Sequence, residues 1–251
     1  TFHGPPINAG GKLNWIQKLS PRIRGWRQME YHELLSPSVQ CVVTVSSKVQ
    51  HALLAEYPDL KDKYLQLGWP GVEPSAEHQV KDGFHQASGR FVFVGKEWKR
   101  KGLRRAIDIV ETFRVANPNA MLDVYGVYPS DVPRTLRKKD GLRFKGWSSE
   151  IPWTTYDVLI HPAETEPFGM VVAEARSQGV AVLMSDQVGA ADLAFAGVRI
   201  VPIGASLNEW ASALHELLAS LNRSVEAKWT WDDLVDLHCQ AIYSQLEAEV
   251  L

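Results

Sequence analysis

Two glutamates, Glu166 and Glu174, are the residues whose type and spacing most directly suggest chemistry. A pair of carboxylates can perform glycoside hydrolysis, which requires the two groups to lie less than about 10 Å apart. Eight residues of helix rise roughly 12 Å, so this pair is better suited to binding two ends of one ligand. Glu174 could accept hydrogen bonds from a ribose diol, or it could be a solvent-facing helix residue. Glu166 could contact the ligand, or it could cap the helix, a role that Thr165 could fill equally well.

A second candidate is the basic segment that follows Gly95. Six of the ten positions 96–105 are Lys or Arg. Cations at a helix N-terminus oppose the helix dipole, whereas a bound anion would be favoured by the basic side chains and by the helix N–H groups together. The segment therefore predicts a phosphate site, although a solvated basic loop would have the same composition. It lacks the G-x-x-x-x-G-K-[ST] pattern of a Walker loop.

Two histidines are weaker candidates. His3 lies next to Gly4 at the expected end of a strand, and His161 precedes Pro162 near Glu166. A lone histidine is usually structural, and His161 fits a packed core position as well as a cleft. The sequence contains no His/Cys cluster with metal-binding spacing, no Asp-x-Asp motif and no G-x-S-x-G motif. We therefore expect no metal ion and no cofactor, and we expect Lys, Arg and helix N-termini to neutralise the phosphate charge.

Alternating strands and helices must position these residues. Apolar runs predict strands at 91–94, 121–125, 142–144, 157–161, 181–184 and 198–201, and helical spacing predicts helices at 103–113, 167–178, 207–221 and 232–249. Pro167 suits the first turn of the second helix and Gly179 its end, which puts Glu174 about two turns into the helix. The alternation predicts an α/β fold with a parallel sheet whose ligands bind beyond the carboxyl ends of the strands. That edge would include Gly95, Gly126 and Gly146.

A separate region precedes this alternation. Residues 40–45 have the pattern of a strand, and Ser46 or Ser47 is placed to cap a helix that continues to Leu54. The glycines and prolines of residues 67–74 indicate a hinge. We therefore place the domain boundary near residues 70–76.

Composition narrows the class of protein. The formal charge of −2 argues against a nucleic-acid binder that works by bulk charge. Cys41 and Cys239 are the only cysteines and are far apart in sequence, which indicates a reducing, cytoplasmic compartment rather than a disulfide scaffold. No apolar run is long enough to span a membrane, and no signal peptide is visible. Several of the nine tryptophans lie near basic residues, an arrangement that suits an interfacial surface or ordinary core packing.

Taken in order, these segments resemble the motifs of the retaining glycosyltransferases of family 4, which have the two-domain GT-B fold. The matching segments are 1–4, 44–46, 69–73, 93–96 with 100–102, 144–147, 161–175, and 230–231 with Tyr243. Residues 166–174 correspond to the E-x7-E region, the most specific of the motifs. The chain departs from the family pattern at Pro70, Glu73 and Lys96, where the family usually has Asn, Asp and Arg. The Arg100-Lys101-Gly102 and His161-Pro162-Ala163 motifs are similar to those of bacterial lipopolysaccharide-core glucosyltransferases.

The resemblance implies transfer of a sugar, with retained anomeric configuration, from a nucleoside-diphosphate donor to a saccharide or glycolipid acceptor in cell-surface polysaccharide synthesis. A UDP-sugar is the favoured donor and a GDP-sugar is the alternative. By the resemblance, Lys96 and Lys101 would neutralise the leaving diphosphate, Glu166 would face the donor sugar, and Glu174 would bind the ribose. The remaining donor-site residues would be Gly95, Gly146, Trp147, Phe168, Gly169 and Met170, with His3 bordering the donor sugar.

The same resemblance predicts how the chain is divided. Residues 1–72 would be the C-terminal part of an acceptor-side Rossmann-like domain, and residues 73–251 a complete donor domain whose last helix crosses back. We expect a second polypeptide, or a part of a longer protein, to complete the first domain, and we expect peripheral contact with the inner face of the membrane. The alternatives are a non-catalytic nucleotide-sugar-binding subunit and an epimerase of the same fold. A phosphorylase would need a pyridoxal-binding lysine motif, which we do not find.

Overall fold

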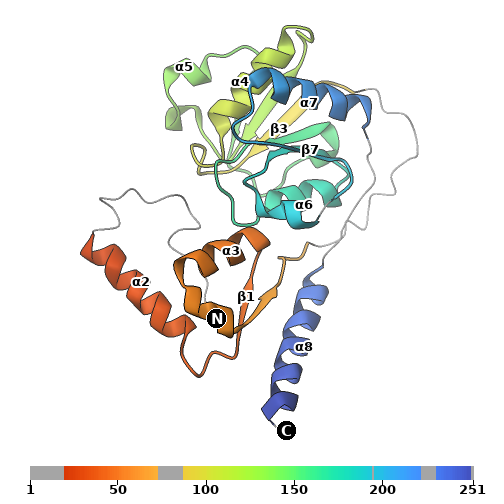
Figure 1. The fold of residues 1–251 in the computed structure, drawn as a ribbon. Coiled ribbons are helices and arrows are strands. Elements are labelled where there is room, and N and C mark those ends of the chain that lie inside the picture. Colours follow the sequence, from red (N-terminus) through yellow and green to blue (C-terminus); the bar gives the residue numbers. More distant parts are fainter. Residues whose placement is uncertain (1–19, 73–86, 194, 222–229, 250–251) are drawn as a thin grey trace. The chain divides into compact units, whose positions relative to one another are not determined.

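The computed structural model describes residues 20–72, 87–193, 195–221 and 230–249. The chain divides into two compact units, each with its own sheet (Figure 1). The first unit comprises Thr1–Val72, Thr165–Phe168 and Trp229–Leu251, and the second comprises Glu73–Glu164 and Gly169–Lys228. None of the helices within the described ranges is long and apolar enough to cross a membrane.

The second unit is built on a six-stranded parallel sheet in the order β5-β4-β3-β6-β7-β8. Its strands are β3 (Arg90–Val94), β4 (Met121–Tyr125), β5 (Leu142–Gly146), β6 (Val158–His161), β7 (Ala181–Ser185) and β8 (Val198–Val201). Numbered within the unit, this is the Rossmann order 3-2-1-4-5-6, which reverses between β3 and β6. The predicted parallel α/β sheet is therefore confirmed, and its reversal marks the edge at which ligands of such sheets bind.

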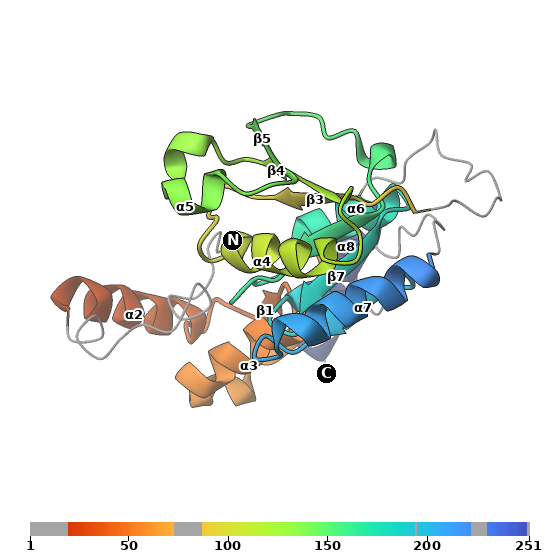
Figure 2. The ribbon, with the colours of Figure 1, turned by 90° about the horizontal axis from the view of Figure 1, so that it is seen from above.

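Helices cover both faces of this sheet. Helices α4 (Leu103–Arg114) and α7 (Leu207–Ala219) lie side by side on one face, and α6 (Met170–Ser177) lies on the other (Figures 1 and 2). Because side chains alternate along a strand, Phe91 and Phe93 point towards α4 and α7, whereas Val92 points towards the opposite face.

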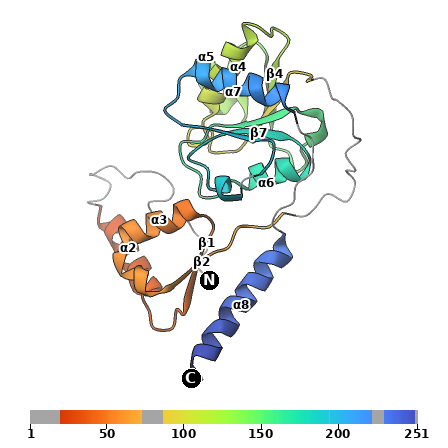
Figure 3. The same ribbon diagram turned by 45° about the vertical axis from the view of Figure 1, so that its right-hand side comes forward.

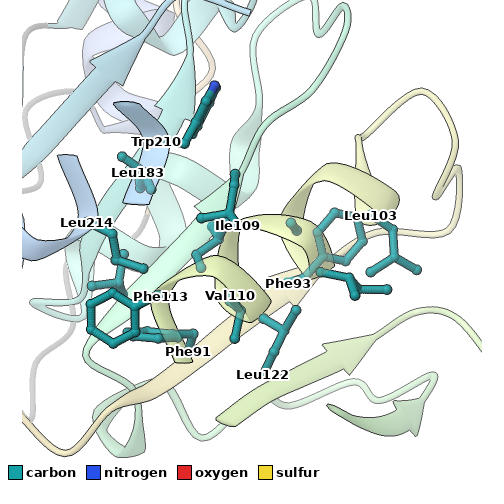
Figure 4. Packing of buried hydrophobic residues seen from close by; sticks show 14 of the residues in the cluster. Phe91, Phe93, Leu103, Ile109, Val110, Phe113, Leu122, Leu183, Trp210 and Leu214 are labelled. Carbon is teal, nitrogen blue, oxygen red and sulfur yellow. The ribbon is translucent and has the colours of Figure 1, made fainter. Parts of the chain in front are cut away.

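The core of the second unit lies between the sheet and the helix pair α4 and α7 (Figure 4). Phe91 of β3 meets Phe113 of α4 edge to face, with 5.4 Å between ring centroids. Trp210 of α7 is completely buried in the same cluster. The apolar spacing that predicted α4 therefore corresponds to its buried face, whose residues are Leu103, Ala106, Ile107, Ile109, Val110 and Phe113.

Helix α6 begins later than its sequence suggests. Pro167 does not start the helix, because the chain first passes through Gly169 in a left-handed conformation, with φ 98°, and the helix begins at Met170. Glu174 is consequently about one turn into the helix rather than two. The predicted end is confirmed: Gly179 has φ 72°, and the N–H groups of Gly179 and Val180 donate to the carbonyls of Arg176 and Ala175.

The first unit contains a two-stranded parallel sheet formed by β1 (Cys41–Thr44) and β2 (Tyr64–Leu67) (Figure 3). Its helices are α2 (Pro21–Leu34), α3 (Ser47–Glu56) and α8 (Trp231–Glu249), together with the short helix η1 (Pro58–Asp62). Ser46 caps α3 by accepting the Val49 N–H at 3.3 Å, as predicted. The sequence did not predict α2 or β2.

A small core holds the first unit together, formed by Leu34, Val42, Val49, Leu53, Tyr57 and Leu60. Buried Glu30 of α2 accepts a hydrogen bond from the Tyr57 hydroxyl at 2.5 Å, which ties α2 to the end of α3. The start of α8 packs so closely on Gly71 that a Cβ there would meet the backbone of Thr230 and Trp231.

Candidate functional site

Three glycines place bare backbone at the carboxyl edge of the sheet in the second unit. Gly95 follows β3, Gly126 follows β4 and Gly146 ends β5, with φ angles of 151°, 82° and 68°. The Gly95 N–H donates to the Tyr125 carbonyl at 3.0 Å, and the Gly126 N–H donates to the Gly146 carbonyl at 2.7 Å. A Cβ on Gly126 would lie 3.0 Å from the Gly95 carbonyl carbon, so the ends of these strands pack too closely for larger residues.

The basic segment lies directly on this edge. The hydrocarbon stem of Lys101 occupies the space that a Cβ on Gly95 would need. Helix α4 then begins from Gly102, which has φ 79° and provides no side-chain cap for the N–H groups of the first turn. The sequence therefore places a lysine and the positive end of a helix beside a glycine at the end of a central strand, an arrangement that suits an anion.

The start of α4 is also held against the end of β6. Gly102 approaches the Pro162 carbonyl so closely that a Cβ would collide with it. The Glu164 N–H donates to the Arg100 carbonyl at 2.9 Å, which links the basic segment to the chain that follows β6. These contacts fix the basic segment at the reversal between β3 and β6.

Lys101 lies close enough to His161 and to Glu174 to act electrostatically on both. His161 ends β6 and is completely buried. Burial, together with the charges of Lys101 and Arg100, lowers the pKa of His161 to about 3. Partial burial raises the pKa of Glu174 on α6, and the charge of Lys101 opposes this rise. Because part of the Glu174 side chain is exposed to solvent, the rise is limited. The structure thus brings Lys101, His161 and Glu174 together, with His161 uncharged at neutral pH and placed as a core residue.

A hollow of about 370 Å³ opens beyond the ends of β3, β4 and β5. It is lined by Lys96, Gly126, Tyr128, Asp131 and Trp147. The side chains of Tyr128 and Trp147 are 52% and 60% exposed, so two aromatic faces are available to a flat ligand group. Sequence reasoning missed Tyr128. The signal that could have found it is its position two residues after Gly126, beyond the carboxyl end of a predicted strand.

Other expected site residues lie in different parts of the structure. Glu166 and Phe168 are buried, and they belong to the segment Thr165–Phe168, which forms part of the first unit. Gly169 and Met170 open α6 in the second unit, and no side chain caps this helix start. His3 lies outside the described residues.

The hollow of the first unit is larger, about 660 Å³, but it has few groups suited to phosphate. Among the residues that line it, the ionisable ones are His32 and Glu33; the others are Gly25, Gln28, Met29, Ser36, Ser38 and Val39. Within the described ranges, no three His, Cys, Asp or Glu side chains come close enough together to hold a metal ion. The edge of the second unit therefore remains the candidate site: it combines lysines, helix starts that no side chain caps, a carboxylate and aromatic faces.

Solved structures with similar folds are glycosyltransferases and related synthases. WaaG, a glycosyltransferase involved in lipopolysaccharide biosynthesis, is 21% identical with a TM-score of 0.64 over 83% of this chain and 61% of its own. Sucrose-phosphate synthase from Thermosynechococcus elongatus is 21% identical with a TM-score of 0.66 over 94% of this chain and 65% of its own. HepE of Anabaena, solved with UDP and glucose, is 17% identical with a TM-score of 0.59 over 83% of this chain and 63% of its own.

These likenesses confirm the expected GT-B type of fold, and this chain spans less than two thirds of the length of each of the three proteins. The search of curated proteins found no match. The model of the family "Glycosyl transferases group 1" matches residues 88–220, which is more than half of the chain and includes the basic segment, the aromatic hollow and Glu174. The chain therefore belongs to the group 1 glycosyl transferases.

Proposed function

We propose that this chain provides the donor side of a retaining glycosyltransferase, which moves a sugar from a nucleoside-diphosphate donor to a saccharide or glycolipid acceptor. UDP-sugars are the favoured donors. The observation that carries the proposal is the position of Lys101, which covers Gly95 at the start of α4 and acts electrostatically on Glu174. A cation, a helix N-terminus and a carboxylate within one small region suit a ligand that has both a diphosphate and a diol.

Each group has a separate role in this proposal. Lys101 and Lys96 neutralise the diphosphate as it leaves, and positive charge already in place before the reaction is an effective way to stabilise such a leaving group. Glu174 accepts hydrogen bonds from the ribose hydroxyls. Trp147 lies beside the nucleobase, where its exposed ring and that of Tyr128 offer stacking surfaces. Cationic side chains take the place of a metal ion, so activity should survive chelation by EDTA.

The sugar being transferred would lie beyond the diphosphate. The N–H groups at the start of α6, from Gly169 and Met170, suit sugar hydroxyls or a phosphate oxygen. On the resemblance of their sequence motifs alone, Glu166, Phe168 and His3 are further proposed sugar-binding residues. We also propose that the acceptor is bound by the first unit together with a second polypeptide or a further part of a longer protein, in synthesis of a cell-surface polysaccharide such as a lipopolysaccharide core.

Calorimetric titration tests the donor half of the proposal. We expect UDP to bind, and GDP and ADP to bind less tightly if the donor is a UDP-sugar. Glu174→Gln removes the charge that strengthens hydrogen bonds to the ribose. It should weaken the binding of UDP at least tenfold, since a hydrogen bond to a charged group contributes about 1.5–3 kcal/mol. The same substitution should leave the binding of 2′,3′-dideoxy-UDP unchanged, because that ligand lacks the ribose diol. The exposed Glu150→Gln is the matched control.

The outcomes distinguish the alternatives. If none of the nucleoside diphosphates binds, the donor-site proposal is wrong. Binding without transfer, when acceptor saccharides and any completing polypeptide are supplied, would favour a non-catalytic nucleotide-sugar-binding subunit. Interconversion of the donor sugar without transfer would favour an epimerase. When transfer is observed, the anomeric configuration of the product, measured by NMR, tests whether the reaction is retaining.

A further inference from the structure

The loop that follows β4 holds a carboxylate beside the aromatic hollow of the second unit. Val127 and Val132, at the two ends of this loop, are buried in the core of the unit. Between them, the short helix η2 (Pro129–Asp131) turns the chain back, so that the Tyr128 N–H donates to Oδ2 of Asp131 at 2.8 Å. The buried ends and this hydrogen bond together restrict where the Asp131 carboxylate can lie.

The Tyr128 ring is held in place as well. A Cβ on Gly146 would lie 2.6 Å from Cε1 of Tyr128, so the ring packs directly on the bare backbone at the end of β5. Trp147 follows Gly146, and the side chains of Trp147 and Tyr128 are both more than half exposed. Asp131 is also exposed and lines the same hollow as these two rings. A flat ligand group stacked on either ring would thus have a hydrogen-bond acceptor near its edge.

We propose that Asp131 determines which nucleobase the donor carries, and that it selects a base with a ring N–H, which is uracil or guanine. This inference rests on the proposed donor site, in which Lys101 binds the diphosphate and Glu174 the ribose. The Watson–Crick edge of the base points away from the ribose and is left for Asp131 to contact. Uracil carries N3–H and guanine N1–H on that edge, whereas cytosine and adenine carry a ring nitrogen with a lone pair. An ionised carboxylate only accepts hydrogen bonds, so it matches the first class.

The Asp131 carboxylate has the capacity for such a bond. Each carboxylate oxygen can accept two hydrogen bonds. The Tyr128 N–H occupies one place on Oδ2, and the Ser130 hydroxyl approaches Oδ1 at 3.4 Å. A ring N–H of the base can take a further place, whereas a ring nitrogen with a lone pair would face the carboxylate oxygens unfavourably. The same side chain therefore attracts one class of base and repels the other at this position.

Calorimetry with UDP, CDP and N3-methyl-UDP tests this proposal. The original chain should bind UDP more tightly than CDP. Asp131→Asn keeps the size of the side chain and an oxygen for the Tyr128 N–H, but it replaces the second acceptor oxygen by an amide that donates. It should lower the ratio of UDP affinity to CDP affinity about tenfold or more, the effect of one hydrogen bond to a charged group.

The methylated ligand isolates the ring nitrogen, because the amino group of cytosine can also donate to a carboxylate. N3-methyl-UDP has no N3–H, so it should bind the original chain weakly and should lose no affinity in Asp131→Asn. If GDP binds more tightly than UDP, a loss of GDP affinity in Asp131→Asn that N1-methyl-GDP does not share would show that the base is guanine.

Asp140→Asn is the matched control. Asp140 is exposed in the same unit but precedes β5, at the opposite end of the sheet from the hollow, so its substitution should leave all these affinities unchanged. An unchanged ratio of UDP to CDP affinity in Asp131→Asn would overturn the proposal, as would equal losses for UDP and N3-methyl-UDP. If UDP binding depends on Lys101 but not on Asp131, only this inference fails, whereas the absence of any nucleoside diphosphate binding would refute the donor site itself.

Discussion

Replacement of His161 by asparagine should remove an acid sensitivity from the folding of this protein. His161 ends β6 with no exposed surface, and the charges of Lys101 and Arg100 lie near enough to disfavour its protonation. Burial and these charges together lower the pKa of His161 to about 3, from 6.5 for an ordinary histidine. Below pH 6.5 the unfolded chain therefore binds a proton at this position that the folded chain does not bind until about pH 3.

The size of the effect follows from proton linkage. Stability rises with pH wherever the unfolded state binds more protons, with a slope of about 1.4 kcal/mol per pH unit for one proton. Because the folded pKa is depressed, the contribution of His161 is fully present above about pH 6.5 and is lost as the pH falls towards 3. Between pH 8 and pH 5, His161 should cost about 2 kcal/mol of unfolding free energy.

Urea unfolding of the original chain, of His161→Asn and of His32→Asn at pH 8 and pH 5 measures this loss. His161→Asn should lose about 2 kcal/mol less than the original chain on acidification, whatever its stability at pH 8. His32 is exposed, so His32→Asn should show the same loss as the original chain. An equal acid loss in the original chain and in His161→Asn would refute the claim that His161 is buried and neutral beside Lys101.

Three glycine substitutions test the backbone at and away from the site. Gly102→Ala should lower the free energy of unfolding by about 1–3 kcal/mol, because Gly102 has φ 79° and a Cβ would collide with the Pro162 carbonyl. Gly204→Ala is the control, since its Cβ would meet no atom within 4 Å, and it should change stability little. Equal effects of the two substitutions in urea unfolding would contradict the close approach of α4 to the end of β6. Gly25→Ala should stabilise the protein by about 0.5–1 kcal/mol, because Gly25 lies within α2 with open space around it; a clear loss of thermal stability would show that something packs against this position.

Much of the second unit could be predicted because its information is local. Apolar spacing identified the buried face of α4, and short apolar runs identified all six strands of its sheet. The order of those strands could not be read in the same way, since the pairing of β3 with β6 joins residues far apart in sequence. Glycines at strand ends were informative because a positive φ, or close packing of backbone, leaves few other residues possible.

The errors have equally specific causes. Pro167 favoured an early helix start, but the left-handed Gly169 delays α6 to Met170 and moves Glu174 one turn nearer the start of the helix. The spacing argument for Glu166 and Glu174 assumed continuous helix, whereas only the residues from Met170 onward are helical. Helix α2 was missed because Gly25 interrupts its middle and its exposed side carries both arginine and tryptophan, which obscures the usual apolar stripe.

The most direct test of the central claim compares Lys101→Ala with Lys99→Ala. Both lysines belong to the basic segment, but Lys101 crosses Gly95 at the strand end, whereas Lys99 lies over the Trp98 ring. Calorimetry with UDP and with uridine separates binding of the diphosphate from binding of the nucleoside.

Lys101→Ala should weaken the binding of UDP by about 10–100-fold and should leave the binding of uridine unchanged. The loss follows because a hydrogen bond to a charged group contributes about 1.5–3 kcal/mol. Lys99→Ala should retain the affinity of the original chain for both ligands. Equal UDP affinity in the original chain and in Lys101→Ala would contradict the assignment of Lys101 to the diphosphate.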